Sequence, residues 1–209
     1  MKRHPFHLFI EGPSRTGKST LLRQMLAPYM DHVGGFASQR LLDDDGNTVA
    51  FRIGSAATTP LTAPFSEAEK PDGIFRITHP DGTTEKFPEV FDRDGIAYLT
   101  QTRNKKLILL DEIGGAELLS APFRGALARV LSGSIPCIGV IKLPEKARFM
   151  SRTAGYAKTV VEYNKDLRRK LQETHNAKVL YFDRDAGDES TAEVKKEIEE
   201  FLCGIFTTS

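Results

Sequence analysis

The chain has few cysteines, no tryptophan and no long hydrophobic run. Its 209 residues include only two cysteines, Cys137 and Cys203, which are too few for a disulfide scaffold or a cysteine-based metal site. No apolar segment is long enough to span a bilayer, and the apolar run near the N-terminus is too short for a signal peptide. We therefore expect no membrane segment and a cytoplasmic location.

The charges have no dominant sign. The 29 Lys and Arg residues nearly balance the 28 Asp and Glu residues, so the protein has no strong field that would attract nucleic acid. A basic run over residues 165–170 lacks interleaved aromatic residues, and we interpret it as a solvated helix face. The five histidines show no metal-ligand spacing and are expected at the surface. No nucleic-acid partner is expected.

One motif, at residues 12–20, indicates a specific chemistry. It follows a strand-like apolar run, opens a helical pattern and matches the phosphate-binding loop G-x-x-x-x-G-K-[ST]. Glycines allow successive backbone N–H groups to surround phosphate oxygens, Lys18 places an ammonium on the β- and γ-phosphates, and Ser19 offers a hydroxyl to Mg²⁺. The predicted nucleotide-binding residues are Gly12, Pro13, Ser14, Arg15, Thr16, Gly17, Lys18, Ser19 and Thr20.

A second part of the site is predicted where the apolar run 106–110 ends. Asp111 follows a segment typical of a strand buried on both faces, and from there a carboxylate can reach Mg²⁺ bound at Ser19. Because strand side chains alternate, Asp111 and Glu112 should have separate roles. We assign Asp111 to magnesium, and Glu112 to orienting and deprotonating an attacking water. Lys18 and Glu112 are thus the predicted catalytic residues.

Strand-like and helix-like segments alternate along most of the chain. This predicts a single α/β domain over residues 1–209, with the three-layer P-loop NTPase fold and a mainly parallel sheet. Inserted β-hairpins are expected between residues 36 and 88, with a solvated turn, rather than a metal site, at the acidic run 43–45. Strands are predicted at 6–11, 36–42, 48–53, 74–78, 83–87, 106–110, 135–141, 158–162 and 179–182; helices at 18–30, 89–102, 122–131, 144–152, 165–173 and 191–206; and a loop at 54–72.

Other classes of nucleotide-binding protein fit these motifs less well. Residues 111–114 also match the D-x-x-G of GTP-binding switches, but residues 164–166 are one residue short of the guanine-reading N-K-x-D. A transporter ATPase is excluded because its signature precedes the Asp-Glu pair, whereas the similar run 131–134 follows it. A kinase acting on a nucleotide or small alcohol and a non-enzymatic nucleotide-dependent switch remain as alternatives. The arginines that could aid phosphoryl transfer are Arg15, Arg124, Arg148 and Arg152.

Three features, in this order, resemble the nucleoside-triphosphatase family of P-loop NTPases. They are the phosphate loop, the Gly-Gly-Phe hairpin start at 34–36, and the segment 110–114 followed by Glu117, Leu118 and Phe123. The resemblance covers about residues 6–182. It implies a fold close to the nucleotide kinases and slow Mg²⁺-dependent hydrolysis of ATP, GTP and other NTPs to NDP and phosphate. It also implies that Lys18, Ser19 and Thr20 contact phosphates and magnesium, Asp111 magnesium, and Glu112 water.

The chain departs from that family at three places. Asn164-Lys165 stands where the family usually has Asn-Arg after the late strand, and a lysine cannot stack on a base as a planar guanidinium does. Gly-Gly-Ala-Glu at 114–117 replaces Gly-Lys-Met-Glu, and the segment 54–88 is longer and rich in hairpins. We expect broad base specificity. The sequence does not define the oligomeric state, and a monomer is compatible with it.

Overall fold

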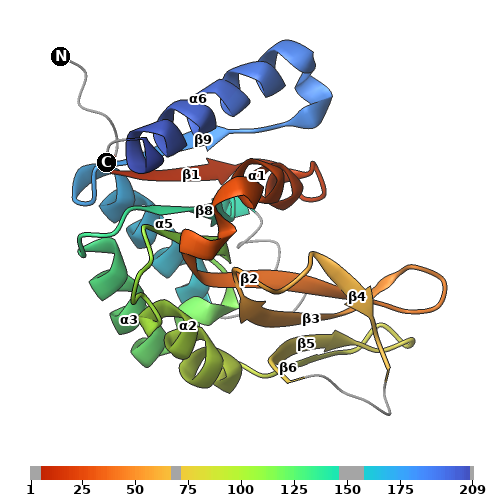
Figure 1. Ribbon diagram of the computed structural model, residues 1–209. Coiled ribbons are helices and arrows are strands. Elements are labelled where there is room, and N and C mark those ends of the chain that lie inside the picture. The colour runs from red at the N-terminus through yellow and green to blue at the C-terminus, as the bar shows by residue number, and fades with distance from the viewer. Residues whose placement is uncertain (1–5, 67–71, 146–157, 208–209) are drawn as a thin grey trace.

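A mixed β-sheet forms the middle layer of the protein (Figure 1). The computed structural model describes residues 6–66, 72–145 and 158–207, and within these ranges nine strands belong to the sheet. Its central part is parallel and has the order β2, β7, β8, β1, β9. These strands span Val33–Leu42, Leu107–Ile113, Cys137–Ile141, His7–Glu11 and Ala177–Tyr181, respectively.

An antiparallel extension continues the sheet beyond β2. Strands β3 (Thr48–Ser55), β5 (Ile74–Thr78) and β6 (Thr84–Lys86) follow in that order, which confirms the two predicted hairpins. The acidic run forms the predicted turn, in which the Asp43 carboxylate accepts a hydrogen bond of 2.7 Å from the Asn47 N–H. The prediction of a structureless loop over 54–72 is wrong in part, because β4 (Thr62–Pro64) pairs in parallel with the end of β2.

Helices cover both faces of the sheet, which confirms the predicted three-layer α/β architecture. Buried side chains of α1 and α6 pack on one face, and those of α3 and α5 pack on the other together with Leu99 of α2. The described helices contain none that is long and apolar enough to cross a membrane. The helices are α1 (Lys18–Leu26), α2 (Ile96–Thr100), α3 (Ala121–Leu131), α5 (Lys158–Glu173) and α6 (Asp188–Phe206).

The strand predicted at 158–162 is wrong, because these residues form the first turns of α5. Neighbouring β-branched residues favour a strand locally. The buried positions Val160, Asn164, Leu167 and Leu171 nevertheless recur at helical spacing and pack as one stripe, so tertiary packing determines the outcome.

Two other predicted helices have different limits, and a third is mostly untested. The helix predicted at 18–30 ends at Leu26 and continues as a 3₁₀ segment, Ala27–His32. The one predicted at 89–102 consists of a π-helical turn, Phe91–Gly95, followed by α2. Most of the helix predicted at 144–152 lies outside the described residues.

The prediction that His7 lies at the surface is wrong. His7 is completely buried at the start of β1. Its Nε2 lies 3.0 Å from the carbonyl oxygen of Leu131, and the N–H of Cys137 donates to its Nδ1 at 2.9 Å. These contacts require a neutral ring with the proton on Nε2. Burial is the main reason why the pKa of His7 falls to about 4.

We predict that His7 makes the protein less stable in mild acid. Between about pH 6.5 and pH 4 the unfolded chain binds a proton on His7 but the folded protein does not, so the free energy of unfolding falls as the pH falls. The loss attributable to this residue is at most about 3 kcal/mol. Urea denaturation of the parent and His7→Gln from pH 7 to 4.5 measures it. The variant should lose less stability over this range, and equal losses would contradict the assignment.

Candidate active site

The phosphate-loop motif leaves the sheet at the carboxyl end of a buried strand. Residues 8–10 of β1 are fully buried, and β1 pairs with β8 on one side and β9 on the other. Gly12, the first loop residue, has a φ of 144° and lies against the end of β9. A Cβ at Gly12 would stand 1.9 Å from the carbonyl oxygen of Phe182, so only glycine fits there. The packing of this glycine thus fixes the start of the loop.

The ammonium of Lys18 points back into the loop. Its Nζ donates to the carbonyl oxygen of Gly12 at 3.1 Å, to Thr16 Oγ1 at 3.2 Å, and also to the carbonyl oxygen of Pro13. The Thr16 hydroxyl in turn donates to the Pro13 carbonyl oxygen at 3.0 Å. A cation held inside a glycine-bearing loop at the N-terminus of a helix is an arrangement that binds phosphate groups.

Asp111 meets this loop through Ser19. Ser19 Oγ donates to Asp111 Oδ1 at 2.8 Å, although the two residues are 92 positions apart. Asp111 is 2% exposed, and this burial raises its pKa to about 6 even though the Ser19 hydrogen bond and the charge of Arg23 favour the ionised form. A hydroxyl and a carboxylate side by side are oxygen donors of the kind that Mg²⁺ prefers. The structure thus brings together the two predicted metal ligands.

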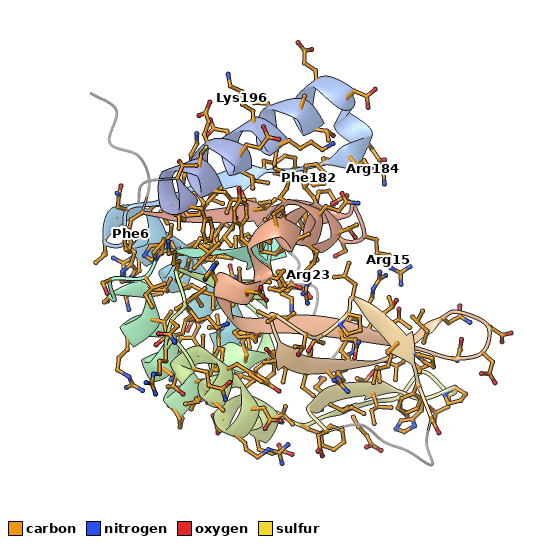
Figure 2. All side chains as sticks on the ribbon, in the orientation of Figure 1. Phe6, Arg15, Arg23, Phe182, Arg184 and Lys196 are labelled. Atoms are coloured by element: carbon orange, nitrogen blue, oxygen red, sulfur yellow. The ribbon has the colours of Figure 1, made fainter. Side chains whose placement is uncertain are left out.

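Arg23 is a site residue that the sequence motifs did not identify. Its guanidinium donates to the carbonyl oxygens of Ala56 (2.6 Å) and Thr59, and Figure 2 shows it between α1 and β2. Burial lowers the pKa of Arg23, whereas the negative charge of Asp111 raises it. Arg23 lies four residues after Ser19, so both side chains share one face of α1. This helical spacing is a signal that could have identified it.

Glu112 has a backbone conformation that is unusual for a residue with a side chain. Its φ is 69°, in the left-handed region. The β7–β8 register shifts between Leu110 and Ile113, so β7 contains a bulge at the Asp-Glu pair. Such bulges redirect side chains beside active sites. Asp111 is buried against Ser19, whereas Glu112 is partly exposed, with its Oε2 3.9 Å from Lys142 Nζ.

Two buried polar side chains hold the turn that follows Glu112. Glu117 accepts hydrogen bonds from the N–H groups of Gly114 (2.5 Å) and Gly115 (2.7 Å). Asn164 of α5, which is completely buried, donates from Nδ2 to the carbonyl oxygen of Gly114 at 2.8 Å. Because these buried backbone groups are satisfied by side chains from outside the strand, the turn has a defined shape.

The predicted match of Asn164-Lys165 to the family's Asn-Arg pair, which follows a late strand, is wrong. Both residues lie within α5, where Asn164 is buried and Lys165 is exposed. The last strand of the described sheet is β9, and the segment that follows it is 182–187. Arg184 lies in this segment and is exposed.

The candidate arginines have different environments. Arg15 is exposed in the phosphate loop, with a φ of 67°. Arg124 donates to the carbonyl oxygen of Leu119 at 3.2 Å, and its guanidinium carbon lies 4.0 Å from the centre of the Tyr163 ring, so it joins α3 to α5. Arg148 and Arg152 lie outside the described residues.

The basic run of α5 is only partly the solvated face that was predicted. Arg169 and Lys170 are exposed and both form ion pairs with Asp166. Arg168 differs because it is mostly buried and pairs with Glu11, the last residue of β1 before the phosphate loop. This ion pair links α5 to the base of the loop.

A hollow lined by residues such as Phe6, Lys106 and Phe201 lies at the opposite end of the sheet. Phe6 and Leu8 mark the amino end of β1, whereas the phosphate loop follows its carboxyl end. Because ligands of parallel α/β sheets bind beyond the carboxyl ends of the strands, we place the active site at the loop.

Comparison with known proteins agrees with this geometry. The profile of the family described as "NTPase" matches residues 7–174. The chain belongs to this NTPase family. The nucleoside-triphosphatase THEP1 of Thermotoga sp. (strain RQ2) is 27% identical over 143 residues, covering 65% of this chain and 73% of that protein. The protein of the same name from Thermotoga petrophila is 27% identical over 170 residues, covering 76% and 86%.

Two solved structures of nucleoside triphosphatases share the fold of this NTPase family member. The solution structure of a human cancer-related nucleoside triphosphatase has a TM-score of 0.58 at 19% identity, covering 97% of this chain and 98% of that chain. The crystal structure of THEP1 from Aquifex aeolicus has a TM-score of 0.55 at 18% identity, covering 92% and 99%. The P-loop NTPase fold predicted from the motifs is confirmed.

We predict that glycine at position 112 of this NTPase gives a more stable protein than alanine. In a strand or helix alanine is normally more stabilising than glycine, but at a φ of 69° a Cβ costs about 1 kcal/mol that glycine avoids. Glu112→Gly should therefore unfold at higher urea concentration than Glu112→Ala. An alanine variant that is the more stable would show that residue 112 does not occupy the left-handed region in solution.

Proposed function

We propose that this NTPase hydrolyses nucleoside triphosphates to nucleoside diphosphate and phosphate with the help of Mg²⁺ and with broad base specificity. Its membership of the NTPase family supports hydrolysis. The observation that carries the proposal is the 2.8 Å contact between Ser19 and Asp111, because it joins the phosphate loop to a buried carboxylate whose neighbour is Glu112. Phosphate, metal and water would thus share one small site.

The Mg²⁺ ion would be held by Ser19 Oγ and, directly or through water, by the Asp111 carboxylate. Both groups offer oxygen, and no third protein ligand is required when phosphate oxygens and waters complete the shell. When bound, the ion supplies positive charge that stabilises the phosphate oxygens during transfer.

The side chains of the loop would bind and orient the triphosphate. Lys18 already lies inside the loop, where its ammonium contacts three oxygen acceptors. Phosphate oxygens would take the place of these acceptors, since an ammonium interacts more strongly with an anion than with a carbonyl group. Gly12 and Gly17 both have positive φ values, which allow the loop conformation. The Ser19 hydroxyl would bind the metal beside them.

Glu112 would orient the attacking water and accept its proton. Its carboxylate is partly exposed at the carboxyl end of β7, so water can reach it. For phosphoryl transfer, placing the nucleophile in line contributes more than removing its proton, so the fixed geometry of the turn is important.

The segment after β9 is where we propose that the base lies. By resemblance, an arginine that follows the late strand lies near the base, and here Arg184 is in that segment. Figure 2 shows Arg184 and Arg15 at the same end of the molecule. A guanidinium can stack on any base without reading its edge, which is consistent with broad specificity.

We predict that the parent protein releases phosphate from ATP, GTP, CTP and UTP in Mg²⁺ with no acceptor present. Glu112→Gln should lower kcat by about 100-fold or more, because it removes the proton acceptor and alters water placement, but should leave nucleotide affinity nearly unchanged. Phosphate release and equilibrium binding of a non-hydrolysable nucleotide measure the two quantities.

Lys18→Ala and an acceptor assay provide the controls. Lys18→Ala should lose nucleotide affinity, in contrast to Glu112→Gln. If phosphate leaves the nucleotide only when a second nucleotide or a small alcohol is added, the protein is a kinase. If nucleotide binds but no phosphate is transferred to water or to any acceptor, the protein is a binding module.

A further inference from the structure

Lys142 lies between the two parts of the proposed active site. It follows the last residue of β8, and β8 separates β7, which carries Asp111 and Glu112, from β1, which leads into the phosphate loop. All three strands are parallel, so their carboxyl ends are at the same edge of the sheet. The chain after β8 therefore leaves the sheet between the strand that carries the carboxylates and the strand that leads into the loop.

The backbone of Lys142 is fixed on both sides. Its N–H donates to the carbonyl oxygen of Ile113 at 2.8 Å, and its own carbonyl oxygen accepts from Asn164 Nδ2 at 3.2 Å. Asn164 also bonds to Gly114, so one buried amide joins the chain that follows β8 to the turn that follows Glu112. The starting point of the Lys142 side chain is thus tied to the segment that carries Glu112.

The side chain of Lys142 is mostly buried, and its ammonium lies near the carboxylate of Glu112. The side chain is 17% exposed, and Nζ is 3.9 Å from Glu112 Oε2. A Cβ on Gly115 would stand 2.8 Å from Nζ and 3.0 Å from Glu117 Oε2, so the absence of a side chain at position 115 leaves the room that the ammonium occupies. Glu117 already accepts two backbone hydrogen bonds, whereas the partly exposed Glu112 carboxylate is the more adjustable neighbour.

We propose that Lys142 is a positioning residue that holds the Glu112 carboxylate in the direction of the phosphate loop. The attraction between the Lys142 ammonium and the Glu112 carboxylate draws this carboxylate from the end of β7 towards β8, the strand next to β1. There the carboxylate stands between the turn and a nucleotide bound in the loop, where an attacking water must lie. The inference rests on the proposed role of Glu112 and adds the residue that orients it.

The first test removes the charge but keeps the length of the side chain. Lys142→Met should lower kcat for phosphate release by about 10- to 100-fold, because a misplaced nucleophile costs that much. Affinity for a Mg²⁺–nucleotide analogue should stay within about twofold. Lys142→Arg should restore most of kcat. The matched control is Lys196→Met on the exposed face of α6, which should leave kcat unchanged.

The second test asks whether Lys142 acts through Glu112. In a double-mutant cycle, Lys142→Met should cause no further loss in a Glu112→Gln protein, measured in single turnovers with labelled nucleotide over hours. A purely structural lysine would lower kcat by the same factor in both backgrounds. Thermal unfolding of every variant shows whether the fold is intact.

The outcomes separate this inference from the proposed function. If Glu112→Gln abolishes hydrolysis but Lys142→Met does not lower it, Lys142 has no positioning role and the proposed function stands. An equal loss in both backgrounds, or a loss of nucleotide affinity in Lys142→Met, overturns the inference as well. If Glu112→Gln hydrolyses normally, the role of Glu112 is wrong and the inference fails with it.

Discussion

The hydrogen bond between Ser19 and Asp111 is the contact on which the proposed chemistry depends. It connects the first turn of α1 to the end of β7, across the intervening strand β8. Neither the helix that carries Ser19 nor the strand that carries Asp111 could bring the two side chains together without the rest of the sheet. The parallel pairing of β1, β8 and β7 brings the carboxyl ends of the strands to one edge, and buried apolar side chains on both faces keep them there. The fold thus turns a separation of 92 residues into a distance of 2.8 Å.

The same edge of the sheet contains two features that lower the stability of the folded protein. Asp111 is an almost completely buried carboxylate, and Glu112 has a left-handed backbone conformation; each costs on the order of 1 to 3 kcal/mol. Glu117 and Asn164 offset part of this cost by satisfying the backbone of the following turn. Strain and buried charge that persist at one place are characteristic of sites where geometry serves chemistry.

The parts that could be predicted from sequence are those with a local signal. The loop at 12–20 has a motif, Asp111 ends an apolar run, and the hairpins have turn residues. Arg23 has only a weak signal, its helical spacing from Ser19, and Lys142 and Asn164 have none, because their contacts come from segments far away in the sequence. The strand predicted at 158–162 shows the opposite error, in which local β-propensity is overridden by the packing of a helical stripe. His7 was misplaced because its burial depends on Leu131 and Cys137, both distant in the chain.

The central claim is that Ser19 and Asp111 bind one metal ion together with the nucleotide. Replacing the Ser19 hydroxyl by a thiol tests it directly, since Mg²⁺ prefers oxygen ligands whereas Mn²⁺ and especially Cd²⁺ accept sulfur more readily. The measurement is the rate of phosphate release by Ser19→Cys with each metal, divided by the rate of the parent protein. We predict a loss of about tenfold or more in Mg²⁺ and a substantial recovery in Mn²⁺ or Cd²⁺. A loss of equal size with all three metals would contradict direct coordination by residue 19.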